Sequence, residues 1–208
     1  MDKIRVTAHL NAPIVTGGGY MTLDGLLGAL LFDLVQDVDA AHAAIPVRST
    51  DGLFHASAVI MEPIERSRVA FIASLRPNHS IDPDLILKNR RGELHRKFDS
   101  SVTNVMNGYR MLTAPTATWY TEGDADQIRK LLEPVQFIGK RRASGFGRVT
   151  QWEFEPDDQD GIEGPFGEAL RPIPKEMFRG DLTQPLVDAA WRPAYWRVEH
   201  RASCYVPS

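Results

Sequence analysis

The apolar and polar positions near the N-terminus change their period from two to about 3.6 residues. Residues 3–10, "KIRVTAHL", place four apolar side chains on one face, which predicts a half-buried strand. After a glycine-rich stretch, leucines and valines recur at helical spacing from Leu26 to Val38, with Thr22 or Asp24 as the expected N-cap. The pattern predicts a strand followed by a strongly amphipathic helix.

The middle of the chain has three strand-like segments. Residues 52–62 and 66–76 are separated only by the short "PIER", so we expect an antiparallel pair. Residues 108–123 also resemble a strand, which Pro115 places at an edge or breaks. Between the second and third of these segments the apolar alternation is replaced by polar and basic residues, which predicts an insertion outside the core.

A second helix and a last strand follow. In "DADQIRKLLEPV" (124–135), Asp124 and Gln127 resemble a capping box and Pro134 closes the helix, while residues 148–155 are strand-like. The order strand, helix, strand, strand, helix, strand predicts an α+β, ferredoxin-like (RRM-like) antiparallel sheet with two helices. We expect one such domain at 1–155, with a basic insertion at about 77–100, and a C-terminal extension at 156–208 that packs on the same domain.

Composition narrows the class of protein. The chain has 208 residues, 43% of them hydrophobic, with no apolar run of membrane-spanning length and no secretory signal, so a cytoplasmic location is expected. The single cysteine, Cys204, excludes an internal disulfide and a CxxC zinc site, and is expected to act as a small apolar residue. A pI of about 6.1 disfavours nucleic-acid binding through global charge, so such binding would have to be local.

The segment "GKRRASGFGRV" (139–149) provides such a local charge. Gly145 and Gly147 flank Phe146, and we expect them to hold its aromatic face out in front of the backbone. The loop follows a helix and enters a strand, the reverse of a nucleotide-binding loop, and neither GxxxxGK[ST] nor GxGxxG is present. This argues against NTP hydrolysis and NAD binding. A plain turn remains the alternative, but the cations and the aromatic residue favour an RNA backbone.

A second basic segment, "KNRRGELHRK" (88–97), allows two interpretations. It could be a solvated insertion without function, or its side chains could reach across a bound RNA strand. The residues concerned are Lys88, Arg90, Arg91, His95, Arg96 and Lys97.

Histidines and carboxylates give no catalytic or metal-binding motif. His9, His55 and His200 lie in expected strands, and His79 and His95 lie in the insertion; for each we favour a structural or surface role. No HxH or HExxH occurs, and the acidic run at 157–160 is typical of a solvated turn. We therefore expect no catalytic residue, no metal and no cofactor.

The final strand preceded by "IGKRRASGFGRV" resembles the RAMP superfamily of CRISPR-associated proteins, which have a glycine-rich loop after the last core helix. Together with the opening "RVTAHLNAPIVTGGGYMTLDGLL" and the tail "LRPIPKEMF...AAWRPAYWR", the chain is similar to the Cas-five-like subunit of type IV CRISPR effector complexes, the third gene product of that system.

The resemblance implies a non-catalytic subunit that grips the 5′ handle of the guide RNA and caps one end of a filament of backbone subunits. Its partners would be the guide RNA, the backbone and other subunits of the complex and, indirectly, target DNA. The implied RNA-binding residues are Lys140, Arg141, Arg142, Ser144, Gly145, Phe146, Gly147 and Arg148. Residues 88–97 would match the thumb-like projection of such subunits.

Two alternatives stay open at this point. One is a metal-independent endoribonuclease of the same superfamily that uses His79 or His95. The other is a protein interaction module without RNA. In the tail, we expect Trp191 to pack under the sheet, while Trp196 and Arg197 are residue types that anchor protein interfaces.

Overall fold

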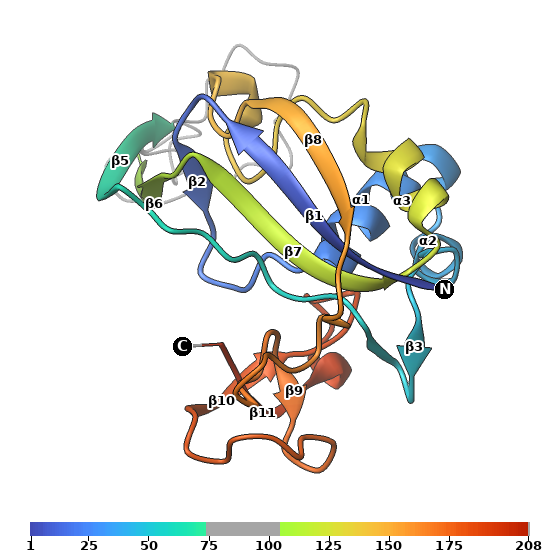
Figure 1. Cartoon of the computed structure of the whole chain (residues 1–208). Helices are drawn as coiled ribbons and strands as arrows, with labels where there is room; N and C mark the ends of the chain where they lie inside the picture. The colour runs from blue at the N-terminus through green and yellow to red at the C-terminus, as the bar shows by residue number, and fades with distance from the viewer. Residues whose placement is uncertain (74–104, 208) are drawn as a thin grey trace, which may run out of the picture. The chain divides into compact units, whose positions relative to one another are not determined.

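The computed structural model describes residues 1–73 and 105–207 (Figure 1). The chain forms two compact units, one of Met1–Arg66 with Leu112–Ser208 and one of Ser67–Met111. None of the helices within the described ranges is both long and apolar enough to cross a bilayer.

The described residues form more strands than helices. The helices are α1 (Leu23–Val35), α2 (Val38–Ala43) and α3 (Ala125–Leu132), with 3₁₀ turns η2 (Arg142–Ser144) and η3 (Val198–His200). The strands of the first half are β1 (Asp2–Leu10), β2 (Ile14–Thr16), β3 (Ser49–Thr50), β4 (Leu53–Phe54) and β5 (Glu65–Ala73). Those of the second half are β6 (Val105–Thr113), β7 (Thr116–Gly123), β8 (Val149–Pro156), β9 (Ile173–Pro174), β10 (Leu186–Ala190) and β11 (Arg201–Tyr205).

The main sheet has β1 at its centre, antiparallel to both β7 and β8 (Figure 1). Val6 lies opposite Trp119 on β7 and Phe154 on β8. Residues 56–60 add single bridges to the outer edge of β7, at Ala56↔Thr121 and Ile60↔Thr118. The chain therefore has a mixed α/β fold built mostly from antiparallel strands, as the sequence predicted at this level.

Both longer helices cover one face of this sheet. The period-two pattern of β1 buries Ile4, Val6 and Ala8 in one cluster with side chains of both helices, among them Leu27 and Ile128. The opposite face carries polar pairs, including Arg5 with Glu155 and His9 with Glu153. The alternation in the sequence thus separates an apolar helix-facing side from a polar open side.

The starts of α1 and α3 agree with the prediction from the sequence, whereas the end of α1 does not. Thr22 caps α1, since its hydroxyl accepts from the N–H of Gly25 at 3.3 Å, and Asp124 caps α3 by accepting from the N–H of Gln127 at 3.0 Å. The apolar spacing predicted one helix through Val38. Instead α1 ends where Gln36 takes a left-handed φ of 56°, and Val38 begins α2.

The predicted pairing of 52–62 with 66–76 is wrong. The sheet neighbour of β5 is β6, while residues 56–60 lie beside β7, so no hairpin forms across "PIER" within the described residues. The break at Pro115 is confirmed, because it separates β6 from β7 and its carbonyl accepts from the N–H of Leu10 at 2.8 Å. Apolar alternation identifies a segment as a strand, but it does not show which other strand lies beside it.

The C-terminal region of the larger unit forms its own small sheet, in the order β10-β11-β9. Cys204 is buried there, as expected of an apolar residue, and burial raises the pKa of its thiol to about 11. Trp191 packs against the clusters of this region around Leu53 and Ala189, and not under the main sheet. This small sheet has its own apolar core, which offers Trp191 closer partners than the main sheet.

A buried polar network joins this region to α1. Arg171 is fully buried and donates to both carboxylate oxygens of Asp24 at 3.3 Å, to the carbonyl of Trp191 at 2.7 Å and to the hydroxyl of Tyr195 at 3.0 Å. It also donates to the carbonyls of Phe54 and Ala56. Burial opposes the charge, but Asp24 and Tyr195 favour it, and the pKa of Arg171 is raised.

Candidate nucleic-acid interface

The glycine loop, residues 139–149, connects α3 to β8 in the order that the sequence predicted. Its backbone takes left-handed conformations at four positions: Gly139 (φ 80°), Arg141 (59°), Gly145 (86°) and Gly147 (66°). A Cβ at Gly147 would lie 2.0 Å from the carbonyl oxygen of Ile138, so a side chain there cannot fit without a backbone shift. The glycines are thus required by this backbone path.

Backbone hydrogen bonds tie the loop to β2 and to Pro13, the residue before it. The N–H of Lys140 donates to Val15 and that of Gly147 to Pro13, both at 2.8 Å, and Ile138 donates to the carbonyl of Gly147 at 2.9 Å. Between these anchors, residues 142–144 form the single turn η2. The loop is therefore held by its main chain, and its path does not depend on the exposed side chains.

Exposed cations line this backbone. Lys140, Arg142 and Arg148 are exposed, and within the part of the chain that the structure describes none of them takes part in an ion pair. Arg141 is only half-buried and has interactions of its own. Positive charge without a carboxylate partner favours an anion from solution.

Phe146 does not project as the sequence suggested. Phe146 is half-buried and has interactions of its own, and the next residue, Gly147, is buried and bonded to Pro13 and Ile138. Only part of the ring is accessible for stacking. Ser144 and Gly145 are exposed, and nothing lies within 4 Å of a Cβ built at Gly145.

A second glycine-rich segment lies beside the loop. A Cβ built at Gly17 would be 3.0 Å from Cε and 3.1 Å from Nζ of Lys140, so this lysine lies over Gly17. Gly18 and Gly19, which follow, are exposed and have open space around them. Sequence reasoning did not assign these glycines to the site, although the run "GGG" at 17–19 was a signal that could have prompted it.

Grooves border the loop on two sides. One is lined partly by the polar residues Gln136, Thr150 and Gln151, with one cation, Arg148, and one carboxylate, Glu133. The other lies between α1 and α3 and is mainly apolar, with Arg142 at its side; its lining includes Leu30, Leu34, Leu131 and Phe137. Each groove thus has a cation of the loop in its lining, together with one carboxylate, Asp33 or Glu133.

The second basic segment lies outside the described residues. This applies to all of its predicted RNA-binding residues, Lys88, Arg90, Arg91, His95, Arg96 and Lys97, and also to His79. Their part in any site stays a prediction.

The described histidines have local partners. His9 Nε2 lies 3.1 Å from Glu153, and Nδ1 of the buried His200 lies 3.2 Å from the carbonyl of Ala194. His55 lies in a cluster with Glu122 and Asp160, three residues that the sequence did not bring together. Asp160 was expected in a solvated turn, but its side chain is 30% exposed and faces His55.

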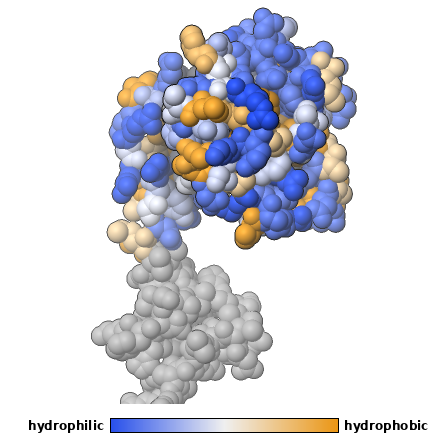
Figure 2. All heavy atoms as spheres, turned by 90° about the horizontal axis from the view of Figure 1, so that it is seen from below, coloured by the Kyte–Doolittle hydropathy of each residue, from blue (hydrophilic) through white to orange (hydrophobic). Residues whose placement is uncertain are grey.

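On one face of the described residues, the hydrophobic surface is broken up rather than continuous. The face seen from below the view of Figure 1 shows separate hydrophobic patches among hydrophilic residues (Figure 2). Individual apolar side chains are nevertheless strongly exposed in the C-terminal region: Phe166 at 90%, Val198 at 79% and Trp196 at 72%.

Comparison with known proteins gives a family and distant structural likenesses. The sequence model described as "CRISPR type IV associated protein Csf3" matches residues 96–207, just over half of the chain. No curated protein matches. A chain in the "Cryo-EM structure of the Type III-B Cmr-beta bound to cognate target RNA" is similar at 8% identity with a TM-score of 0.40. That likeness covers 74% of this chain and 61% of the other, so the chain spans about three fifths of that neighbour's length.

Proposed function

We propose, because this chain belongs to the Csf3 family of CRISPR type IV associated proteins, that it is a non-catalytic, guide RNA-binding subunit of a type IV CRISPR ribonucleoprotein. In this proposal the glycine loop holds the 5′ handle of the guide, and the protein caps one end of the backbone filament. The observation that carries it is the set of exposed cations without ion-pair partners in the described residues, Lys140, Arg142 and Arg148, on a backbone anchored at Pro13 and Val15.

The physical case rests on local charge. The chain as a whole is acidic, with a formal net charge of -3, so a polyanion would be repelled by most of the surface and attracted only where cations gather. Ion pairs elsewhere in the described part of the chain neutralise Arg5, Arg48 and Arg201, whereas the exposed loop cations are left for a ligand. The phosphates of single-stranded RNA are anions that these cations can bind.

We also propose that the fold is ferredoxin-like in its strand order. Support comes from residues 56–60, which bridge to β7, and from β1, which lies between β7 and β8 with antiparallel pairing throughout. With α1 and α3 on one face, this is the arrangement of a split βαβ pair. The glycine loop then precedes the last strand of that arrangement.

The direct test is RNA binding by fluorescence anisotropy with labelled 5′-handle RNA over a range of salt concentrations. Replacing Lys140, Arg142 and Arg148 together by Ala should weaken binding and flatten the salt dependence by about 0.7 log units for each phosphate that is no longer neutralised. Arg141 is left unchanged because its left-handed, half-buried position would mix folding with binding.

A matched control replaces Lys175 and Arg179, two exposed cations of the C-terminal region, by Ala. This variant should bind like the original protein, apart from a small uniform decrease in affinity. Equal weakening by both variants would mean non-specific attraction, and an unchanged salt slope in the loop variant would remove the glycine loop from the interface.

The proposal also expects intact RNA after incubation. Denaturing gels of labelled repeat RNA, with and without divalent metal, should show no specific products. Specific products that disappear in a His79→Ala or His95→Ala variant would establish the ribonuclease alternative instead.

The proposed end position in a complex draws on exposed apolar side chains. Trp196 is 72% exposed, and Trp is a residue type that anchors protein interfaces. Co-expression with the backbone subunit and guide RNA, followed by native mass spectrometry, should give one copy of this chain per assembly. Recovery only as a free monomer would contradict the assembly proposal while leaving RNA binding to the anisotropy test.

A further inference from the structure

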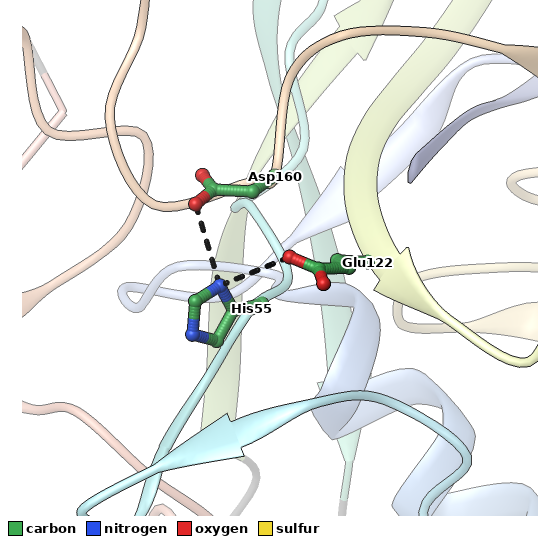
Figure 3. Close-up of side chains that lie close together, drawn as sticks. All are labelled: His55, Glu122 and Asp160. Atoms are coloured by element: carbon green, nitrogen blue, oxygen red, sulfur yellow. Dashed lines mark ion pairs between the residues drawn. The ribbon is translucent and has the colours of Figure 1, made fainter. Parts of the chain in front are cut away.

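His55, Glu122 and Asp160 come from three separate segments and point toward one another (Figure 3). Nδ1 of His55 lies 3.3 Å from Oδ2 of Asp160 and 3.8 Å from Oε2 of Glu122, and one ligand atom from each residue lies within 4.8 Å of the other two. Glu122 belongs to β7, His55 follows β4, and Asp160 lies in the chain after β8.

Neighbouring groups hold each side chain in place. Nε2 of His55 lies 2.9 Å from the hydroxyl of Thr50, and Oδ1 of Asp160 accepts from the N–H of Ile162 at 2.9 Å. Arg48 donates to both oxygens of Glu122 at 2.9 and 3.1 Å. The N–H of Glu122 donates to the carbonyl of His55 at 3.0 Å. The three side chains are thus oriented before any ligand arrives.

One buried atom of the cluster lies close to two carboxylates but forms no hydrogen bond in good geometry. Nδ1 of His55 is buried, yet neither carboxylate meets it in hydrogen-bond geometry. A buried polar nitrogen without a partner costs free energy, and native structures rarely leave one without a reason. Its position between two carboxylate oxygens is that of a ligand atom.

The three side chains supply ligand types that suit a divalent metal ion, one imidazole nitrogen and two carboxylate oxygens. Two cations lie near the carboxylates, because Arg48 donates to Glu122 and Lys3 acts on Asp160. A metal ion would therefore be held by direct coordination and not by an excess of negative charge.

We propose that His55 Nδ1, Glu122 Oε2 and Asp160 Oδ2 bind one divalent first-row transition-metal ion, of which Zn²⁺ is the representative. Imidazole nitrogen and carboxylate oxygen bind Zn²⁺ at about 2.0–2.2 Å, which puts tetrahedral ligands about 3.3–3.6 Å apart. The observed 3.3 and 3.8 Å between ligand atoms are close to that edge length. Thr50 would accept from Nε2–H and fix the tautomer that leaves Nδ1 free to bind.

The ion would act as a cross-link. It would join the segment after β8, through Asp160, to β7 and to the segment after β4. An ion that binds only the folded chain stabilises it by mass action. None of the three ligands belongs to the glycine loop, and the proposal does not depend on RNA binding.

The test uses the full chain, freed of metal with a chelator, in calorimetric titration with ZnCl₂ and in thermal melting with and without Zn²⁺. One Zn²⁺ per chain and a higher melting temperature are expected. Asp160→Asn keeps the shape of the side chain and should weaken Zn²⁺ binding by about 100-fold and abolish the rise in melting temperature.

Glu153→Gln is the matched control, because Glu153 also faces a histidine, His9, at 3.1 Å but without a third ligand in the described residues. It should bind Zn²⁺ like the original chain. His55→Gln should lose Zn²⁺ binding as well; if that variant fails to fold, Asp160→Asn still decides. No saturable binding by the original chain, or equal binding by Asp160→Asn that folds normally by circular dichroism, would overturn the proposal.

Discussion

Arg171 and the cations of the glycine loop lie in the same unit but in opposite surroundings. Arg171 is fully buried, and five acceptor groups surround its guanidinium. Arg142 and Arg148 are exposed and pair with no carboxylate in the described part of the chain. The same side chain is part of the buried core in one place, whereas in the other it is exposed and has no ion-pair partner in the described residues.

This difference shows that residue type alone does not indicate function. A buried guanidinium must have partners, because its desolvation costs several kcal/mol when they are missing. An exposed guanidinium costs little free energy whether or not it has a partner. An exposed cation without an ion-pair partner is therefore a sign of function only where backbone hydrogen bonds, and not the charge, hold the segment in place. The glycine loop meets this condition.

The largest effect is expected from breaking the buried network. Arg171→Met leaves Asp24 as a buried charge without its main partner and should reduce the free energy of unfolding by about 3–5 kcal/mol, measured by urea denaturation. Tyr195→Phe removes only the hydroxyl that donates to Asp24 at 2.6 Å and should cost about 1–2 kcal/mol.

Adding Asp24→Leu to Arg171→Met should recover part of the stability, because the remaining charge is removed as well. A double variant no more stable than Arg171→Met would show that poorer packing, and not the isolated charge, causes the effect.

A smaller effect is expected from the backbone of the glycine loop. Gly147→Ala places a Cβ against the carbonyl oxygen of Ile138 at a φ of 66°, and should cost about 2–3 kcal/mol of unfolding free energy. Gly145→Ala has a similar φ of 86° but open space, and should cost only about 1 kcal/mol. Chemical denaturation of both variants gives the comparison; equal costs would mean that the anchor at Ile138 does not limit the loop.

The smallest effect on stability is expected from the loop cations. Replacing Lys140, Arg142 and Arg148 by Ala should change the free energy of unfolding by less than about 0.5 kcal/mol, because none of them forms an ion pair in the described residues. Thermal melting of this variant checks it. A clear decrease in stability would place these side chains in the fold and weaken the case that they serve RNA.

Local signals in the sequence located the elements but not all of their partners. The alternation of residues 3–10 indicated β1, and the caps Thr22 and Asp124 indicated the starts of α1 and α3. The pairing of residues 56–60 with β7 was missed, because apolar alternation identifies a strand without identifying its neighbour. The cations of the glycine loop were found because they are consecutive, whereas Gly17 beside Lys140 was not.

What the sequence by itself determined is local: periodicity, helix caps, glycines where left-handed backbone is needed, and the charge of the loop. What only the tertiary structure decided is which distant groups meet. Asp24 and Arg171 are 147 positions apart in the chain. His55, Glu122 and Asp160 come from three separate segments. Neither group can be predicted from the spacing of its residues in the sequence. The reason is physical: burial and proximity change what a charged side chain does, and both arise only when the strands have paired and the core has closed.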